Sequence, residues 1–307
     1  MSLKTPEMVD CLGLGIIPLD ILLTVPNYPK AGHKINATDL TIQGGGPVPN
    51  AFVGLNRLGA STSFIAAVGD DVIGRMIIDE LKFEGVDTRF MIVKQEPSAL
   101  AVGFIEHASG RRTIALHRTI AVKSNDLSLS RYPIPRILHL DGRDVEACKN
   151  LARWGRKVGA IISFDIGSIR NDVSAIFKLV DHLVVADAYA FPFTGTRSTK
   201  NAIQRLARYC KGTIVVTEGI AGSIGCENGQ FCAHPAFRVK NVDTTGAGDS
   251  FHAGYLYGLL RGWPLEERLR FGAATAALKC TRPGARTGAP TLAAVRRFLR
   301  NRPKTYA

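Results

Sequence analysis

Residues 136–165, RILHLDGRDVEACKNLARWGRKVGAIISFD, decide the fold class of this chain. The apolar runs at 136–140 and 160–165 are typical of buried strands, and the segment at about 143–158 between them is typical of a helix. A strand, a crossover helix and a second strand form the unit from which parallel sheets are built. The stretch therefore predicts two neighbouring parallel strands.

The same alternation continues along most of the 307 residues. Strands that are buried on both faces and separated by helices indicate an α/β fold with a doubly wound, mostly parallel sheet. We expect a single domain of this kind over residues 1–307. Further strands are predicted at 9–16, 62–68, 182–186 and 213–217, and helices at 49–58, 72–84, 172–180, 199–210, 247–260, 264–280 and 291–301.

Two extended segments, 33–43 and 99–117, interrupt this alternation because neither has a following helix. The second contains a Ser109-Gly110 turn, which is typical of a hairpin. We interpret them as a small β-sheet inserted in the domain, with lid segments at about 18–44 and 96–120 that cover a site. The alternative is an antiparallel edge of the main sheet.

Net charge, the absence of recognisable targeting or nucleic-acid motifs, and cysteine spacing limit the kinds of partner that we expect for this protein. The net charge of +13 favours either a solvated basic surface, which best explains the basic cluster at the C-terminus, or a positive field that attracts a phosphorylated or sulfonated small molecule. No nucleic-acid module, signal peptide or membrane span is recognisable, so we expect a cytoplasmic protein that binds neither nucleic acid nor membrane. The six cysteines are scattered without metal-site spacing, which argues against a disulfide or zinc framework.

Residues 241–254, NVDTTGAGDSFHAG, contain the first candidate site. Val242 is predicted to end a strand from about 236, and a helix follows the small residues Gly246, Ala247 and Gly248. Free N–H groups at a helix start bind anions. Asp249 in the first turn would repel an anion, which is unfavourable in a site that only binds one. Its presence is explained if Asp249 positions a substrate hydroxyl for phosphoryl transfer. The alternative is a capped, glycine-rich helix start.

A second glycine-rich segment, QGGGPVPN at 43–50, also precedes a helix. Gly45 and Gly46 would let a polar ligand lie against the backbone, and Asn50 would hydrogen-bond its hydroxyl groups. Asp20 interrupts an apolar stretch, where a charge is costly unless it is paired or exposed. It is interpreted either as a carboxylate that accepts sugar hydroxyls or as a turn residue.

Together these motifs resemble the ribokinase-type (PfkB) carbohydrate kinase family. Asp243-Thr-Thr-Gly-Ala-Gly-Asp249-Ser-Phe251 is similar to its C-terminal signature, and Gly45-Gly46-x-x-x-Asn50 to its N-terminal one, with a fit from about residue 9 to 290. The resemblance implies transfer of the γ-phosphoryl group of ATP, with Mg²⁺, to a primary hydroxyl of a ketose or furanose sugar. It also implies a homodimer formed through the lid.

The resemblance assigns roles by position. It implies Asp249 as the catalytic base, Gly246, Ala247 and Gly248 as the anion hole, and Asp20, Gly45, Gly46 and Asn50 as sugar contacts. For ATP it implies that Thr217, Gly219 and Gly222 contact the phosphates and that 275–288 lie beside the adenine. For a monovalent cation such as K⁺ it implies a site formed by Asp243 and 282–288.

The chain departs from the family where an Asn-x-x-Glu motif would lie near magnesium. It reads Ala186-Asp187-Ala188-Tyr189, so Asp187 is the residue expected to take part of that role. Other short stretches are similar to the sulfofructose kinase-like or ketohexokinase-like branch. That likeness places Lys34 and Arg143 against an anionic sugar such as sulfofructose, whereas the alternative makes both surface residues. A nucleoside kinase and a non-catalytic sugar or nucleotide sensor are the competing functions.

Overall fold

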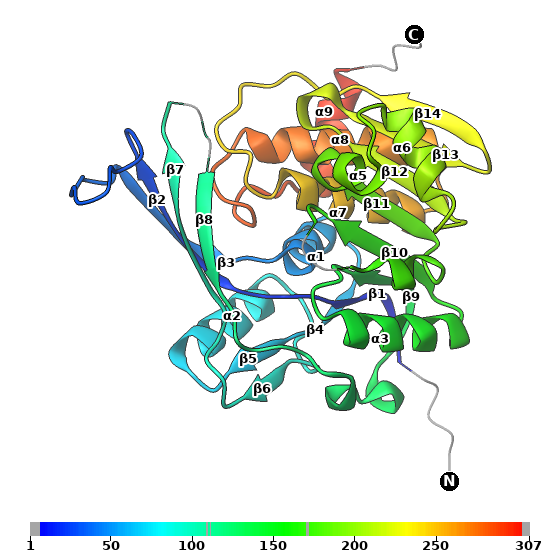
Figure 1. Ribbon diagram of the computed structural model, residues 1–307, viewed down its shortest axis with the longest axis horizontal. Helices are drawn as coiled ribbons and strands as arrows, with labels where there is room; N and C mark the ends of the chain where they lie inside the picture. The colour runs from blue at the N-terminus through cyan, green and yellow to red at the C-terminus, as the bar shows by residue number, and fades with distance from the viewer. Residues whose placement is uncertain (1–6, 109, 111, 170–171, 303–307) are drawn as a thin grey trace.

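A central sheet of eight strands forms the middle of the molecule in the computed structural model, which describes residues 7–108, 110, 112–169 and 172–302 (Figure 1). Its strand pairs are parallel from β4 to β12, and β13 and β14 add an antiparallel edge. The predicted, mostly parallel α/β sheet is confirmed. The spatial order is β14 (Gln230–His234), β13 (Ser223–Glu227), β12 (Thr213–Thr217), β11 (His182–Ala186), β10 (Ile161–Ile166), β9 (Ile134–Leu140), β1 (Met8–Leu14) and β4 (Thr62–Ile65).

Helices cover the sheet on two sides, and the core is accordingly divided into two large apolar clusters. One cluster packs Leu151 of α3 and Ile203 of α6 against the strands, and the other packs Phe52 of α1 and Leu256 of α7. This is the doubly wound arrangement. The helices are α1 (Pro47–Arg57), α2 (Val72–Phe83), α3 (Val145–Lys157), α4 (Ser174–Phe177), α5 (Asp187–Thr194), α6 (Thr199–Leu206), α7 (Ala247–Leu260), α8 (Leu265–Cys280) and α9 (Leu292–Arg300), with 3₁₀ turns η1 (Ser124–Asp126), η2 (Leu129–Arg131) and η3 (Gly219–Ala221).

A second, four-stranded sheet projects from the body at the left of Figure 1. Its order is β3 (Asp39–Gly44), β2 (Leu19–Val25), β7 (Leu100–Glu106) and β8 (Arg112–His117). A separate pair joins β5 (Ala67–Gly69) to β6 (Ile92–Lys94). The small additional sheet predicted from the two extended segments is therefore present. Ser109, in the predicted turn between β7 and β8, lies outside the described residues.

The two faces of the small sheet differ, because side chains alternate along a strand and paired residues share a face. The strand register assigns each residue to one of these faces. We call the face that carries Asp20 the inner face and the opposite one the outer face. The inner face carries Asp20, Leu22, Ala101, Arg112, Ile114 and Leu116, and the outer face carries Ile21, Leu23, Leu40, Ile42, Val102 and Phe104.

Three local predictions were wrong. Residues 236–242 form no strand: the ring of Phe237 packs 5.3 Å from that of Phe298 in α9, and the Val242 N–H donates to the Cys280 carbonyl. Segment 62–68 divides at Ala66 into β4 and β5, which pair with different strands. Helix 172–180 shortens to Ser174–Phe177 in the described residues, and α5 was not foreseen.

None of the helices in the described part of the chain combines the length and the apolar content that crossing a membrane requires.

Candidate active site

The predicted anion site lies at the start of α7. Gly246 adopts a left-handed conformation with φ of 73°, and a Cβ at this position would lie 2.6 Å from the Cβ of Ala285. Only glycine adopts this conformation without strain and leaves that space. No side chain caps the helix, but the Ala247 N–H donates to the Thr244 carbonyl at 3.1 Å, so the helix start offers an anion its remaining N–H groups.

Asp249 lies in this first helical turn, opposite the start of α1. Its Oδ2 accepts a hydrogen bond of 2.7 Å from the Asn50 Nδ2, although the two residues are 199 positions apart. Burial, and next the negative charge of Asp165, raise the pKa of Asp249 to about 6. The carboxyl group is therefore a stronger base than an exposed aspartate, yet it remains ionised at neutral pH.

Arg286 fixes the position of Asn50, and sequence reasoning missed it. Its buried guanidinium donates to the Asn50 Oδ1 at 3.0 Å, to the Gly45 carbonyl at 2.9 Å and to the Glu80 Oε2 at 2.9 Å. The Asn50 amide can thus turn only its Nδ2 toward Asp249. In the sequence Arg286 is one of many basic residues, and no local signal marks it as buried.

Asp20 faces the same space from the small sheet. A Cβ on Gly45 would collide with its carboxylate, which explains why a glycine faces it. Burial raises the pKa of Asp20 to about 7, against the opposing charge of Arg286. The charge of Asp249 also raises the pKa of Asp20, which shows that the two carboxylates lie near each other. With the contacts of Gly45 and Asn50, the structure thus brings these four predicted residues together. Gly46 completes the turn before α1 with φ of 97°.

A buried histidine–aspartate cluster adjoins Asp249. His252, one helical turn after Asp249, places its Nε2 3.1 Å from the Asp165 Oδ1, and this partner holds the pKa of Asp165 below its usual range despite burial. His139 donates to or accepts from the Ser163 hydroxyl, and burial lowers its pKa to about 3. One ligand atom from each of the three residues lies within 4.8 Å of the others, a set that could hold an imidazole-preferring transition metal.

The structure separates the two predicted anion-binding cations. Lys34 is exposed in the loop beyond Thr24 and Asp39, at the opposite end of the β2–β3 pair from Asp20. Arg143 follows β9, and its charge acts on Asp165 and Asp141. Arg112, which sequence reasoning missed, is on the inner face of the small sheet, and its charge lowers the pKa of both Asp20 and Asp249.

The predicted nucleotide contacts lie at the carboxyl end of β12. Thr217 ends this strand, and Gly219 and Gly222 belong to the turn that leads into β13. Both glycines have positive φ, and a Cβ on Gly222 would collide with the His234 carbonyl. Ala186 pairs with Thr217, so Asp187 begins α5 beside this turn.

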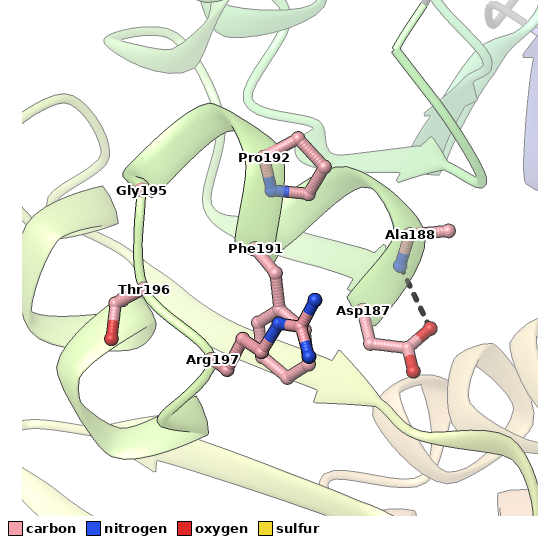
Figure 2. A pocket seen from close by; sticks show the side chains of 7 residues that line it. All are labelled: Asp187, Ala188, Phe191, Pro192, Gly195, Thr196 and Arg197. Carbon is pink, nitrogen blue, oxygen red and sulfur yellow. Dashed lines mark hydrogen bonds between the residues drawn. The ribbon is translucent and has the colours of Figure 1, made fainter.

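Asp187 is the acid available in the 186–189 segment. Tyr189 points into the core, where its ring stacks on Phe193 at 5.2 Å, and Ala186 has no ligand atom. Asp187 instead lines a pocket of about 700 Å³ with Phe191, Arg197 and neighbouring residues (Figure 2). Magnesium binds through one or two carboxylates, phosphates and waters, so the Asp187 carboxylate is a ligand of the kind that this ion uses.

This combination of fold and site defines a sugar-phosphorylating enzyme class: the chain belongs to the pfkB family of carbohydrate kinases, whose model matches residues 7–292. The predicted family, ribokinase-like fold and carbohydrate kinase activity are confirmed.

Individual relatives are distant in sequence. The chain is 26% identical to the 5-dehydro-2-deoxygluconokinase of Geobacillus thermodenitrificans, over 95% of this chain and 94% of that one. It is 27% identical to the ribokinase of Haemophilus influenzae, over 93% and 97%. The crystal structure of ribokinase from Thermotoga maritima superposes with a TM-score of 0.83 at 25% identity, over 95% of this chain and 100% of that one.

Proposed function

We propose that this carbohydrate kinase transfers the γ-phosphoryl group of ATP to a primary hydroxyl of a ketose or furanose sugar that carries an anionic group. The observation that supports it is the Asp249 carboxylate, held by Asn50 in the first turn of a helix whose free N–H groups bind anions. A base and an anion site in one helical turn suit in-line phosphoryl transfer.

Each group then has a defined task. Asp249 accepts the hydrogen bond of the sugar hydroxyl and takes its proton as the bond to phosphorus forms. The N–H groups of Gly246 and Gly248 hold the transferred phosphoryl oxygens, and Asp20 accepts other sugar hydroxyls. Mg²⁺, held by Asp187 and by phosphate oxygens near Thr217, would neutralise charge on the phosphates. Gly219 and Gly222 let the ATP phosphates approach the backbone.

The small sheet serves as the lid in this proposal. Its inner face turns Asp20 and Arg112 toward Asp249. A Cβ on Gly110, which lies between β7 and β8, would be 4.0 Å from the Asn241 Nδ2, so Gly110 adjoins the segment that leads to Asp243. This position would exclude water from the transferred phosphoryl group.

Cations at the site favour an anionic sugar. Arg112 approaches from the lid and Arg143 from the end of β9, and a guanidinium binds a carboxylate or sulfonate with two parallel hydrogen bonds. The name 5-dehydro-2-deoxygluconokinase of one relative denotes a sugar acid. The ribokinase relative supports the second candidate, a neutral furanose.

A substrate panel with ATP consumption as the readout tests this proposal. We expect 5-dehydro-2-deoxygluconate or sulfofructose to give a higher kcat/KM than fructose, ribose or adenosine. An Arg112→Gln variant should raise the KM for the anionic sugar about tenfold and leave a neutral sugar unchanged, and the exposed Arg75→Gln serves as control. Preference for ribose or adenosine would contradict the anionic class, and turnover by Asp249→Asn would contradict the mechanism.

We further propose a homodimer that forms through the outer face of the small sheet. Leu40 and Ile42 of β3 and Val102 of β7 expose 53%, 50% and 41% of their surface there, on the two strands that flank β2. A contiguous apolar sheet face is a recurrent protein interface. A second copy of the chain is the occupant that the proposal names.

A further inference from the structure

Lys279, in the last turn of α8, has a completely buried ammonium group. Its Nζ donates a hydrogen bond of 2.6 Å to the Asp243 main-chain carbonyl and lies 3.4 Å from the Asp243 Oδ2. Burying a charged ammonium is costly unless an anion and hydrogen-bond acceptors compensate. Asp243 supplies both, so the Lys279 ammonium is compensated in the core by this one residue.

Asp243 ties the anion-hole turn to the loop that follows α8. Its Oδ1 accepts the Thr245 N–H at 2.8 Å, and its Oδ2 accepts the Gly284 N–H at 2.8 Å. Gly246, the residue after Thr245, packs against Ala285, the residue after Gly284. The ammonium of Lys279 therefore neutralises the carboxylate that joins the two segments forming the anion hole.

A bound monovalent cation beside Asp243, which the family resemblance implies, does not fit this arrangement. Carbonyl and carboxylate oxygens are the ligands that such a hard cation requires. Here the Asp243 carbonyl and Oδ2 already face the Lys279 ammonium. On the other side, a Cβ on Gly288 would lie 3.1 Å from the Lys279 Cε, so the lysine stem fills the space beside that glycine.

We propose that the Lys279 ammonium acts as a permanent internal cation for the anion-hole turn, so that the enzyme needs no added K⁺. Lys279 is then a positioning residue: it acts through Asp243 and the turn and touches neither sugar nor phosphate. The inference rests on the proposed function in one respect, since the turn is taken to hold the transferred phosphoryl group.

The activity test compares variants in buffers whose only monovalent cation is tetramethylammonium. We expect wild-type kcat to change less than twofold on addition of 100 mM KCl. Lys279→Ala should lose at least tenfold in kcat without K⁺ and regain most of it with K⁺ or NH₄⁺, with the sugar KM little changed. Lys279→Met, whose stem still fills the space, should lose activity without rescue. The exposed Lys240→Ala should behave as wild type.

A second measurement does not need turnover. K⁺ should raise the Tm of Lys279→Ala by several degrees more than it raises that of wild type or Lys279→Met, because only the alanine variant has an open cation position. This experiment decides the proposal even if no sugar in the panel is phosphorylated. Strong activation of wild type by K⁺, or equal Tm responses of wild type and Lys279→Ala, would overturn it.

Discussion

Replacing Arg286 with methionine should destabilise the protein strongly, because its guanidinium joins three segments in the core of the site. The side chain is fully buried and donates to Asn50 of α1, to the Gly45 carbonyl before that helix and to Glu80 of α2. Methionine keeps most of the apolar stem, so the change removes the charge and its hydrogen bonds with little loss of packing.

The magnitude follows from the groups left behind. Removing one partner of a buried ion pair costs about 3–5 kcal/mol. The Glu80 side chain is 27% exposed and can partly rehydrate, which moves the expected cost toward the lower limit. The Asn50 Oδ1 and the Gly45 carbonyl lose a donor in a buried place, and each such loss costs about 1–3 kcal/mol. These groups belong to one hydrogen-bond network, so their losses overlap and do not simply add. We therefore expect a loss of about 3–5 kcal/mol in the free energy of unfolding.

Urea unfolding at 25 °C measures this loss as a shift of the midpoint at an unchanged slope. Arg75→Met is the matched control, because the Arg75 side chain is 64% exposed and its pair with Asp70 spans 3.7 Å. It should cost less than about 0.5 kcal/mol. Adding Glu80→Leu to Arg286→Met should recover part of the loss, since no unpaired carboxylate then remains. A loss below about 1 kcal/mol for Arg286→Met would refute the reasoning.

Three further predictions concern the base, the turn and the outer face. The raised pKa of Asp249, about 6, means that kcat/KM should fall about tenfold per pH unit below pH 6, and Asp165→Asn should move this limb to lower pH; a pH–rate profile with an unmoved limb would contradict the stated charge effect. Gly246→Val should abolish turnover, because valine disfavours the left-handed turn and collides with Ala285; normal kcat in a steady-state assay would exclude this requirement. Ile42→Glu should yield monomers by light scattering, whereas an unchanged mass would rule out the outer face as the interface.

Local patterns in the sequence were sufficient for most of the fold. The apolar runs at 182–186 and 213–217 coincide with β11 and β12, and the segment 247–260 coincides with α7. Asp71 caps α2 as its position before the apolar helical repeat indicates, since its side chain accepts the Gly74 N–H. Such features depend on residues a few positions apart, which is why they can be read directly.

The site was predictable only in part. The glycine turns and Asp249 carry short-range signals, because a helix start needs particular residue types within a few positions. Tyr189 shows where this reasoning stops. A position expected near magnesium instead packs in an aromatic cluster with Phe193, and nothing in the four-residue segment itself specifies that packing.

By itself, the sequence determined the parallel α/β sheet, the small additional sheet, the family and the helix that carries Asp249. Only the tertiary structure decided which charges meet. Arg286 reaches Asn50 across 236 positions, and Lys279 reaches Asp243 across 36. Basic residues look alike in a sequence, and their roles depend on which carboxylates the packed helices and loops bring within hydrogen-bond distance. Burial then makes these pairings specific, since an ammonium or guanidinium in the core is stable only where acceptors surround it.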